Sequence, residues 1–580
     1  MATKKQIIQQ FRDFLIEEGL DLFIINATDE YLNEYVSLKS NSRYHLTGFS
    51  GSTGDAIITS DEIYLFVDGR YHLQAEKETD PDFITLVKTG IDKSPQKALY
   101  EKLAELSDKK KKIGIVSSKI SCAGYKELLK IVEDISDIEI YEYEHDPLYK
   151  IIDFKDTEDK ETCLRAVPVE ISGKTAGEKL EYVNNFNKEF EYDLLLITDL
   201  TDIAYLTNLR GSEIAYSSCF KAKALVYKEQ AYIFTNLKKI SSEIKEKFDK
   251  NFIFKEEEDF SSFIQNISVT GGISKVCYHP RSTPLCVFRK IENVSKNSAE
   301  IKDSFISSLK SVKNISELDY IQECYLKTDI VIGRAICWLN QNLEKEIKIS
   351  EKDFSDKVKT FFYEEGAYGL SFEPITASGK NTAFIHYTNP DPKKYINFGD
   401  LVLLDCGAYF DGGYATDVTR TFLAGGSYAI ADSLQKEIYT VVLKGFLRGL
   451  NYEGELTGFN LDNAVREVVN ANKPAGFEFS HGTGHGVGIS VHESPPRIAS
   501  SDLFKTPLAA NMVFTIEPGL YNHEWGGVRI ENTVKTVEKS GKITIKTVTR
   551  ASLDENLINY DMLTDDEKTW LEEYKRFKIG

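Results

Sequence analysis

Long apolar runs are missing from this chain. No stretch approaches the roughly 20 consecutive apolar residues that a membrane-spanning helix needs, so we expect no membrane segment. The first residues, Met1–Leu20, alternate charged and apolar positions at helical spacing, without the continuous apolar core of a signal peptide. Both absences predict a cytoplasmic protein.

Paired cysteines and a positive net charge are missing as well. The eight cysteines show no CxxC pair and no regular spacing, so we interpret them as reduced, mostly buried side chains in a reducing compartment. The 71 basic and 90 acidic residues give a net charge of -19, which repels phosphate backbones and argues against a nucleic-acid partner. A small molecule or a peptide is the expected partner.

Two N-terminal segments look like copies of one α/β unit. Each has an apolar strand, a glycine-containing turn, and a run of 13 residues that alternates around a central polar turn; these runs are Ala56–Asp68 and Ala224–Asn236. The element order is the same in both, which favours duplication. We therefore predict two related α/β domains, over residues 1–160 and 161–310.

The sequence pattern changes near Glu317, where we place the start of a third domain, residues 311–580. A long helix is predicted over Leu318–Asn342 and a second over Lys352–Glu365, followed by glycine-rich and alternating segments. Five of the nine histidines lie at or after His386. Chemistry should therefore concentrate in this domain.

Four carboxylates and one histidine of this domain form a candidate metal site. Asp405 ends an apolar strand, and a turn at Gly412-Gly413 with a returning strand would bring Asp417 beside it. The remaining members are His485, Glu517 and Glu531. Charged groups at the ends of buried strands are costly and repel one another unless a cation binds them.

The composition of this set indicates the kind of metal. Oxygen ligands with one imidazole and no thiolate suit Mn, Co or Fe(II) better than structural Zn. Five side chains can hold two ions if some carboxylates bridge, as in two-metal hydrolases. His481 and His485 are not an HExxH motif, since no Glu follows His481 and four glycines disfavour a helix there. We interpret those glycines as allowing another chain, such as substrate, to approach the backbone.

The ordered set resembles the pita-bread metallopeptidases, and most closely the aminopeptidase P (Xaa-Pro aminopeptidase) branch. The resemblance rests on the strings LLDCGAY, TDVTRTF, HGTGHGVG, VHE, TIEPGLY and GVRIEN around the five residues. Outside that domain, the segments around Gly48–Ser52, Val67–Tyr71, Gly173–Leu180 and Asn208–Ser212 resemble the N-terminal creatinase-like domains of the same branch. The resemblance covers nearly the whole chain. In one departure, Asp405 and Asp417 stand 12 apart where the family has 11, so we expect a bulge or longer turn near Gly412.

The resemblance implies a role for each residue. Asp405 would bind one metal, His485 and Glu517 the other, and Asp417 and Glu531 both, with a hydroxide between the ions as the nucleophile. Glu517 would transfer the proton, while His386 and His492 would contact the peptide and stabilise the oxyanion. His481 would lie nearby as a further catalytic histidine, and Arg529 would orient Asp405. Arg70 and His485 would help to bind substrate.

The resemblance also implies the substrate and the assembly. The expected fold is two creatinase-like α/β domains followed by an α/β (α+β) pita-bread catalytic domain with internal pseudo-symmetry. The expected enzyme is a homodimeric Xaa-Pro aminopeptidase with two divalent ions, Mn2+ first and Co2+, Fe2+ or Zn2+ as alternatives. Its substrates would be peptides with proline second, and Phe384, Tyr387 and Tyr521 are candidates for the proline slot.

Two alternatives remain open. A proline dipeptidase shares the five metal ligands but prefers two-residue substrates, and the three-domain layout favours the aminopeptidase. A non-catalytic pita-bread binding module would have lost metal ligands, whereas all five stand here. Peptide turnover distinguishes these three readings.

Overall fold

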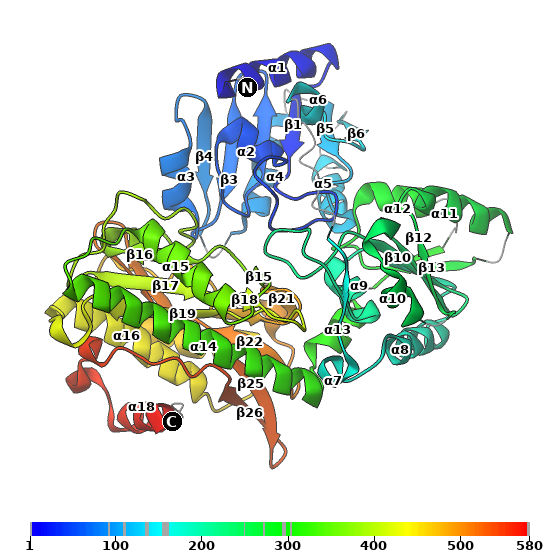
Figure 1. Ribbon diagram of the computed structural model, residues 1–580. Helices are drawn as coiled ribbons and strands as arrows, with labels where there is room; N and C mark the ends of the chain where they lie inside the picture. Colours follow the sequence, from blue (N-terminus) through cyan, green and yellow to red (C-terminus); the bar gives the residue numbers. More distant parts are fainter. Residues whose placement is uncertain are drawn as a thin grey trace. The chain divides into compact units, whose positions relative to one another are not determined.

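Two compact units make up the chain in the computed structural model (Figure 1). The structure describes residues 3–90, 93–107, 112–133, 138–152, 162–248, 250–270, 273–292, 297–301 and 304–576. Unit 1 comprises residues 1–166, 174–215 and 219–306, and unit 2 comprises 167–173, 216–218 and 307–580. The predicted boundary at residues 160 and 161 lies outside the described residues, and the three-domain division stays a prediction.

Unit 1 contains two six-stranded mixed sheets, each with helices beside it (Figure 1). The first sheet has the order β4-β3-β2-β1-β5-β6 and the second β12-β11-β10-β8-β13-β14. The strands of the first are β1 (Leu22–Ile25), β2 (Ala56–Thr59), β3 (Ile63–Val67), β4 (Ile84–Lys88), β5 (Lys112–Val116) and β6 (Glu139–Tyr143). Those of the second are β8 (Leu194–Ile197), β10 (Lys223–Tyr227), β11 (Gln230–Phe234), β12 (Phe252–Lys255), β13 (Lys275–Tyr278) and β14 (Asn297–Glu300).

The two sheets share every strand direction, which confirms that the domains are related. In the first sheet β1 pairs antiparallel with β2 and parallel with β5; in the second, β8 pairs antiparallel with β10 and parallel with β13. The outer pairs also agree: β2–β3 and β10–β11 are antiparallel, and β3–β4, β11–β12, β5–β6 and β13–β14 are parallel. The repeated sequence pattern therefore encodes a repeated topology.

The apolar strands of unit 1 are buried on both faces. Phe23 and Ile25 of β1 join a core with α1 (Lys4–Glu17), whereas Leu22 and Ile24 join one with α4 (Pro95–Ser107). This alternation follows from the two-residue period of a strand, and double coverage explains its continuous apolar sequence. The remaining helices of this unit are α2 (Ser42–Thr47), α3 (His72–Glu78), α5 (Cys122–Glu133), α6 (Leu148–Ile151), α8 (Ala176–Glu189), α9 (Leu200–Thr207), α10 (Ser242–Glu246), α11 (Asp259–Thr270) and α12 (Leu285–Glu292).

Unit 2 has two halves, and each half consists of two helices followed by a sheet. The first half has α14 (Ile315–Glu344), α15 (Glu351–Glu364) and the sheet β16-β17-β19; the second has α16 (Ser433–Leu450), α17 (Gly458–Asn472) and the sheet β21-β20-β22-β25-β26. The strands are β15 (Gly369–Leu370), β16 (Ile375–Ser378), β17 (Leu401–Cys406), β18 (Ala408–Tyr409), β19 (Val418–Leu423), β20 (Gly484–Gly486), β21 (Glu493–Ile498), β22 (Val513–Ile516), β23 (Gly519–Asn522), β24 (Gly526–Arg529), β25 (Asn532–Lys539) and β26 (Lys542–Thr547). The helix α18 (Asp565–Arg576) contacts α16.

Local capping explains where the first two helices of unit 2 begin. Asn314 accepts a hydrogen bond from the Glu317 backbone and Ser350 from that of Asp353, and each partner bonds back, so both helices start with a capping box. The predicted starts, Leu318 and Lys352, were three residues and one residue late. A large core fills the space between α16, α17 and the second sheet; it includes Phe446, Val465, Phe514 and Ile516.

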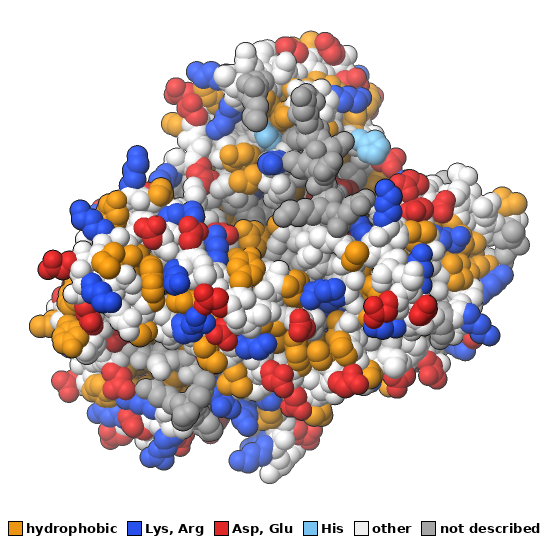
Figure 2. All heavy atoms as spheres, in the orientation of Figure 1, with side chains coloured by type: hydrophobic (Ala, Val, Ile, Leu, Met, Phe, Trp, Pro, Cys, Tyr) orange, Lys and Arg blue, Asp and Glu red, His pale blue; other side chains and the backbone are white. Residues whose placement is uncertain are grey.

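Among the described residues, no helix is both long enough and apolar enough to cross a membrane. Figure 2 shows acidic and basic side chains interspersed over one face of the molecule.

A candidate two-metal centre in unit 2

The five predicted ligands lie in or directly beside five strands of unit 2. Asp405 lies in β17 and Asp417 directly precedes β19, while His485 lies in β20. Glu517 follows β22 and Glu531 precedes β25, and these strands pair so that Ile516 is opposite Asn532. The same register carried one step further sets Glu517 against Glu531.

The hairpin between the two aspartates brings their carboxylates together. Asp405 pairs with Thr419, so Asp417 lies two residues away on the same face of the sheet. The turn runs from Phe410 to Gly413, whose backbone N–H donates to the Phe410 carbonyl at 2.7 Å with a positive φ of 68°. The predicted longer turn is therefore a tight one at the tip, and it leaves both carboxylates in the site.

The two larger sheets of unit 2 and the β23-β24 hairpin meet at this site. The Glu531 N–H donates to the Thr419 carbonyl at 3.2 Å, and the Thr421 hydroxyl donates to the Arg529 carbonyl at 2.9 Å. Thr419 also donates its hydroxyl to Glu531 Oε2 at 2.8 Å. Ligands from both halves of the unit are consequently held in one place.

The geometry groups the ligands closely. Ligand atoms of Asp417, His485 and Glu531 all lie within 4.8 Å of one another. His485 Nε2 is 3.5 Å from Asp417 Oδ2 and 3.6 Å from Glu517 Oε1. These distances are too long for good hydrogen bonds and short enough for one ion to contact several of the atoms.

The orientation of His485 fits metal binding. Its Nδ1 lies 3.1 Å from the Gly486 carbonyl, which can only accept, so Nδ1 carries the proton. Nε2 then faces the carboxylates of Asp417 and Glu517, where a neutral ring offers its lone pair to a metal. A cation between them resolves this contact, and the carbonyl that fixes the tautomer is the usual outer partner of a metal-binding histidine.

Two buried carboxylate oxygens also lack a partner among the described residues. Asp405 Oδ1 and Glu531 Oε1 accept no hydrogen bond, although Asp405 is 8% and Glu531 1% exposed. Buried oxygens of this kind are normally satisfied. These two oxygens, together with His485 Nε2, make a donor set that fits divalent cations.

The electrostatics of the carboxylates also favours a bound cation. Burial raises the pKa of Asp417 well above its usual range, and the charges of Glu531, Asp405 and Glu517 raise it further. Burial likewise raises the pKa of Glu531, with Glu517 and Asp405 adding to it. Divalent cations would compensate the mutual repulsion and the burial of these carboxylates.

Arg529 is the fixed positive charge of the site. Its NH2 donates to Asp405 Oδ2 at 2.7 Å, its NH1 to the Tyr521 hydroxyl at 2.8 Å and its Nε to Thr419 at 3.1 Å. Arg529 therefore turns one oxygen of Asp405 away and leaves Oδ1 for the site. The expected orienting role of Arg529 agrees with this contact.

His481 belongs to a chain of hydrogen bonds beside the ligands. Its Nδ1 donates to the Gly482 carbonyl at 2.8 Å, so its Nε2 accepts from the Tyr521 hydroxyl at 2.9 Å. Tyr521 in turn accepts from Arg529. Nδ1 lies 4.0 Å from Glu517 Oε2. Tyr521, a candidate for the proline slot, thus has its hydroxyl committed to this network.

The other predicted histidines lie in two loops. His492 precedes β21, and its ring lies 4.5 Å from that of His485, edge on. His386 lies in a turn after the 3-10 helix Gly379–Ala383, and its carbonyl accepts from the Thr388 N–H. Nearby, Phe384 and Tyr387 pack with Ile375 and Leu403.

Arg70 lies in unit 1, and its hydrogen bonds to Asp68 and Thr53 are made within that unit. Asp68 holds its guanidinium through two hydrogen bonds, of 2.9 and 2.8 Å, and Thr53 accepts a third at 3.3 Å. The expected contact of Arg70 with peptide stays a prediction.

The glycines around His485 have a different neighbour from the one we expected. A Cβ on Gly484 would lie 1.9 Å from the Thr515 carbonyl, and one on Gly486 would lie 2.2 Å from the Glu493 carbonyl. Adjacent strands of the protein occupy this space. The interpretation that these two glycines admit a substrate backbone was wrong, because close strand packing already requires them.

Three residues that shape the site escaped sequence reasoning. Thr419 bonds Glu531 and Arg529, and the TDVTRTF string offered a signal for it, since residues 417 and 419 of a strand share a face. Lys313 and Glu493 form an ion pair at 2.5 Å with both side chains 1% exposed. Glu493 also accepts from the Ile489 N–H, within the loop that leads to His492.

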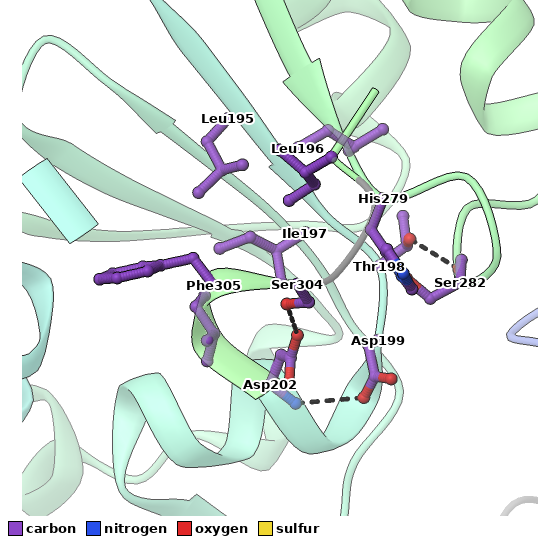
Figure 3. Close-up of a pocket in the computed structure, with 12 residues that line it drawn as sticks. Leu195, Leu196, Ile197, Thr198, Asp199, Asp202, His279, Ser282, Ser304 and Phe305 are labelled. Atoms are coloured by element: carbon purple, nitrogen blue, oxygen red, sulfur yellow. Dashed lines mark hydrogen bonds between the residues drawn. The ribbon is translucent and has the colours of Figure 1, made fainter. Parts of the chain in front are cut away.

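A separate pocket lies in unit 1, at the carboxyl end of β8 (Figure 3). Its polar groups bond one another: Ser304 donates to Asp202 at 2.6 Å, and His279 Nδ1 lies 3.0 Å from the Ser282 hydroxyl. Asp199 accepts from the Asp202 N–H as the N-cap of α9. These carboxylates serve the local fold, and none of the predicted metal ligands lines this pocket.

Comparison with known families supports the sequence reading. Residues 319–538 match metallopeptidase family M24, and residues 7–142 and 156–317 match creatinase/prolidase N-terminal domains. A probable Xaa-Pro aminopeptidase P of Laccaria bicolor is 30% identical over 98% of this chain and 88% of its own length. Xaa-Pro aminopeptidase 1 of Dictyostelium discoideum is 29% identical over 100% of this chain and 93% of its own.

Solved structures share the fold to different extents. The X-prolyl aminopeptidase of Caenorhabditis elegans, described as a cytosolic enzyme with a di-nuclear active site, matches with a TM-score of 0.89 and 24% identity over 99% of this chain and 95% of its own. The Xaa-Pro dipeptidase of Bacillus anthracis matches with a TM-score of 0.54 and 26% identity, over 65% of this chain and 99% of its own. About a third of this chain therefore lies outside the match to the dipeptidase.

Proposed function

The chain belongs to metallopeptidase family M24, with relatives named Xaa-Pro aminopeptidase P, and we propose that it removes the first residue from peptides whose second residue is proline. The observation that carries metal-dependent peptide hydrolysis is the cluster of Asp417, His485 and Glu531, whose ligand atoms lie within 4.8 Å of one another inside the family's domain. The full-length likeness to aminopeptidases favours this activity over dipeptide hydrolysis.

The ligand set fits two divalent ions, with Mn2+ as the proposed metal. Asp405 would hold one ion, His485 and Glu517 the other, and Asp417 and Glu531 both. When bound, such ions neutralise the carboxylates, activate water at neutral pH and polarise a carbonyl. The oxygen-rich donor set with one imidazole and no thiolate supports Mn2+ over structural Zn2+.

The protein's own groups would handle the proton and the peptide. Glu517 would accept a proton at a carboxylate oxygen and return it to the leaving nitrogen. His386 and His492 would donate hydrogen bonds to the peptide as negative charge develops on its carbonyl oxygen. Arg529 would keep Asp405 oriented throughout, because its position is fixed by three hydrogen bonds.

Assembly and location are part of the proposal. We propose a homodimer, on the family resemblance, and a cytoplasmic location. All eight cysteines are free, which supports a reducing compartment. Arg70 of unit 1 is proposed to bind peptide.

Turnover of a tripeptide beside a dipeptide tests the activity. Metal-stripped and Mn-restored protein would be given Arg-Pro-Pro and Arg-Pro, with release of free arginine as the readout. The proposal predicts that only restored protein acts, and faster on the tripeptide. A clear preference for the dipeptide would instead identify a proline dipeptidase.

A further inference from the structure

One buried carboxylate organises the loop that carries His386. Glu351, the first residue of α15, is 0% exposed. Its backbone is fixed on both sides, since its N–H donates to the Lys394 carbonyl at 2.9 Å and its carbonyl accepts from the Thr376 hydroxyl at 3.0 Å. The side chain therefore has a fixed base from which to reach the loop.

Both carboxylate oxygens accept hydrogen bonds from the loop. Oε1 accepts from the Ser378 N–H at 2.7 Å, the Ser378 hydroxyl at 3.0 Å and the Asn381 amide at 3.1 Å. Oε2 accepts from the Tyr387 hydroxyl at 2.8 Å, from Asn381 at 3.0 Å and from the Asp391 N–H at 3.4 Å. Donors on both sides of His386 thus converge on a single side chain.

These donors fit the chemistry of a carboxylate. All are hydroxyl, amide or backbone N–H groups without charge, and a buried ionised carboxylate is stabilised by several such donors. The Asn381 amide also donates to the Tyr387 hydroxyl at 3.1 Å, which ties the start of the loop to the residue after His386. A neutral side chain of the same size could not accept all of these bonds.

We propose that Glu351 is a positioning residue for His386, which it holds in place by gathering Ser378, Asn381 and Tyr387 around its carboxylate. The inference rests on the proposed function, in which His386 contacts the peptide. Glu351 is fully buried, so it acts through the loop. A misplacement of about 1 Å can cost about 100-fold in rate, which makes such a role measurable.

Glu351→Gln is the direct test. The amide retains the shape of the side chain but turns an N–H group toward Tyr387 or Asn381, which need an acceptor. We expect kcat/KM on Arg-Pro-Pro to fall about 10- to 100-fold, while both metal ions stay bound, because the metal ligands lie outside this loop. Glu567→Gln is the matched control: it is another buried carboxylate of unit 2, bonded to Lys444 and Thr564. It should lose stability without losing activity.

A double-mutant cycle with His386→Ala separates positioning from general damage. If Glu351 acts through His386, Glu351→Gln should cost little in the His386→Ala background, since residues that act as a unit are strongly non-additive. Full additivity, or metal loss in Glu351→Gln, would overturn the inference. If His386→Ala alone keeps the wild-type rate, the role assigned to His386 in the proposed function is wrong, whatever Glu351 does.

Asn381→Ala keeps the test valid if Glu351→Gln does not fold. It removes one donor to both oxygens and leaves the others, at a half-buried position. A smaller rate loss that disappears in the His386→Ala background supports the inference. A wild-type rate for a folded Asn381→Ala protein would count against it.

Discussion

Asp417 lies at the centre of the ligand cluster, within reach of His485 and of three other carboxylates. Asp417→Ala should remove a ligand shared by both ions and abolish activity, with the fold kept because the hairpin backbone remains. Metal content by anomalous scattering or elemental analysis is the measurement. Full occupancy of both metal positions in the variant would show that the ligand assignment is mistaken.

His492 is expected to act on the peptide and not on the metals. His492→Ala should keep both ions and lose about 10²- to 10⁴-fold in kcat, the usual range for one proton-transfer or oxyanion group. Steady-state kinetics and metal content would be measured on the same preparation. Metal loss, or an unchanged rate, would mean that ligand and catalytic histidines have been divided wrongly.

At the scale of single residues, the sequence was enough to propose the metal ligands. It did not reveal the residues that hold the site's loops in place. Asp405, Asp417, His485, Glu517 and Glu531 each stand in a recognisable string, because metal binding restricts both residue type and spacing. Glu351 stands in a plain helix start, and its partners lie 27 to 40 residues away. The neighbouring sequence gives no signal for such a residue, because its hydrogen bonds form only when the distant loop folds against the start of α15.

At the scale of elements, a buried ion pair stabilises the start of β21 and the loop that precedes it. Lys313 bonds Glu493, and Glu493 also accepts from the Ile489 N–H at 3.1 Å. Removing one partner of a buried pair leaves an uncompensated charge, at a cost of about 3–5 kcal/mol. Lys313→Met should therefore destabilise unit 2.

Tryptophan fluorescence measures this effect, because Trp338, Trp525 and Trp570 all lie in unit 2. The control is Lys505→Met, whose partner Asp502 is 83% exposed and whose pair is expected to contribute less than about 1 kcal/mol. Equal unfolding midpoints for the two variants would contradict the account of the buried pair.

The elements themselves were predicted well where the pattern was periodic. The paired strands within Ala56–Asp68 and Ala224–Asn236, the strand that carries Asp405 and both helices of the first half of unit 2 form within a few residues of expectation. Around Glu531 the strand pattern is interrupted: β24 stops at Arg529, and Glu531 stands between β24 and β25. Alternation alone cannot show that the chain changes its partner strand there, because the break depends on the hydrogen bond from the Glu531 N–H to Thr419 and on the pairing of β25 with β22.

For the molecule as a whole, metal binding should stabilise one unit and leave the other unchanged. A ligand present at 100 times its dissociation constant adds about 2.7 kcal/mol to stability, and all five proposed ligands lie in unit 2. Chelation should lower the tryptophan-detected midpoint. Hydrogen exchange in the two sheets of unit 1 should stay the same, and a matching loss of protection there would contradict this assignment.

Selective cleavage of three peptides by Mn-restored protein tests the central claim most directly. Arg-Pro-Pro, Arg-Ala-Pro and N-acetyl-Arg-Pro-Pro differ only in the ring after the scissile bond and in the free amino group; proline removes the N–H of that bond and fixes its geometry. The account predicts rapid release of arginine from the first, much slower release from the second and none from the third. Equal rates on the first two, or cleavage of the acetylated peptide, would contradict it.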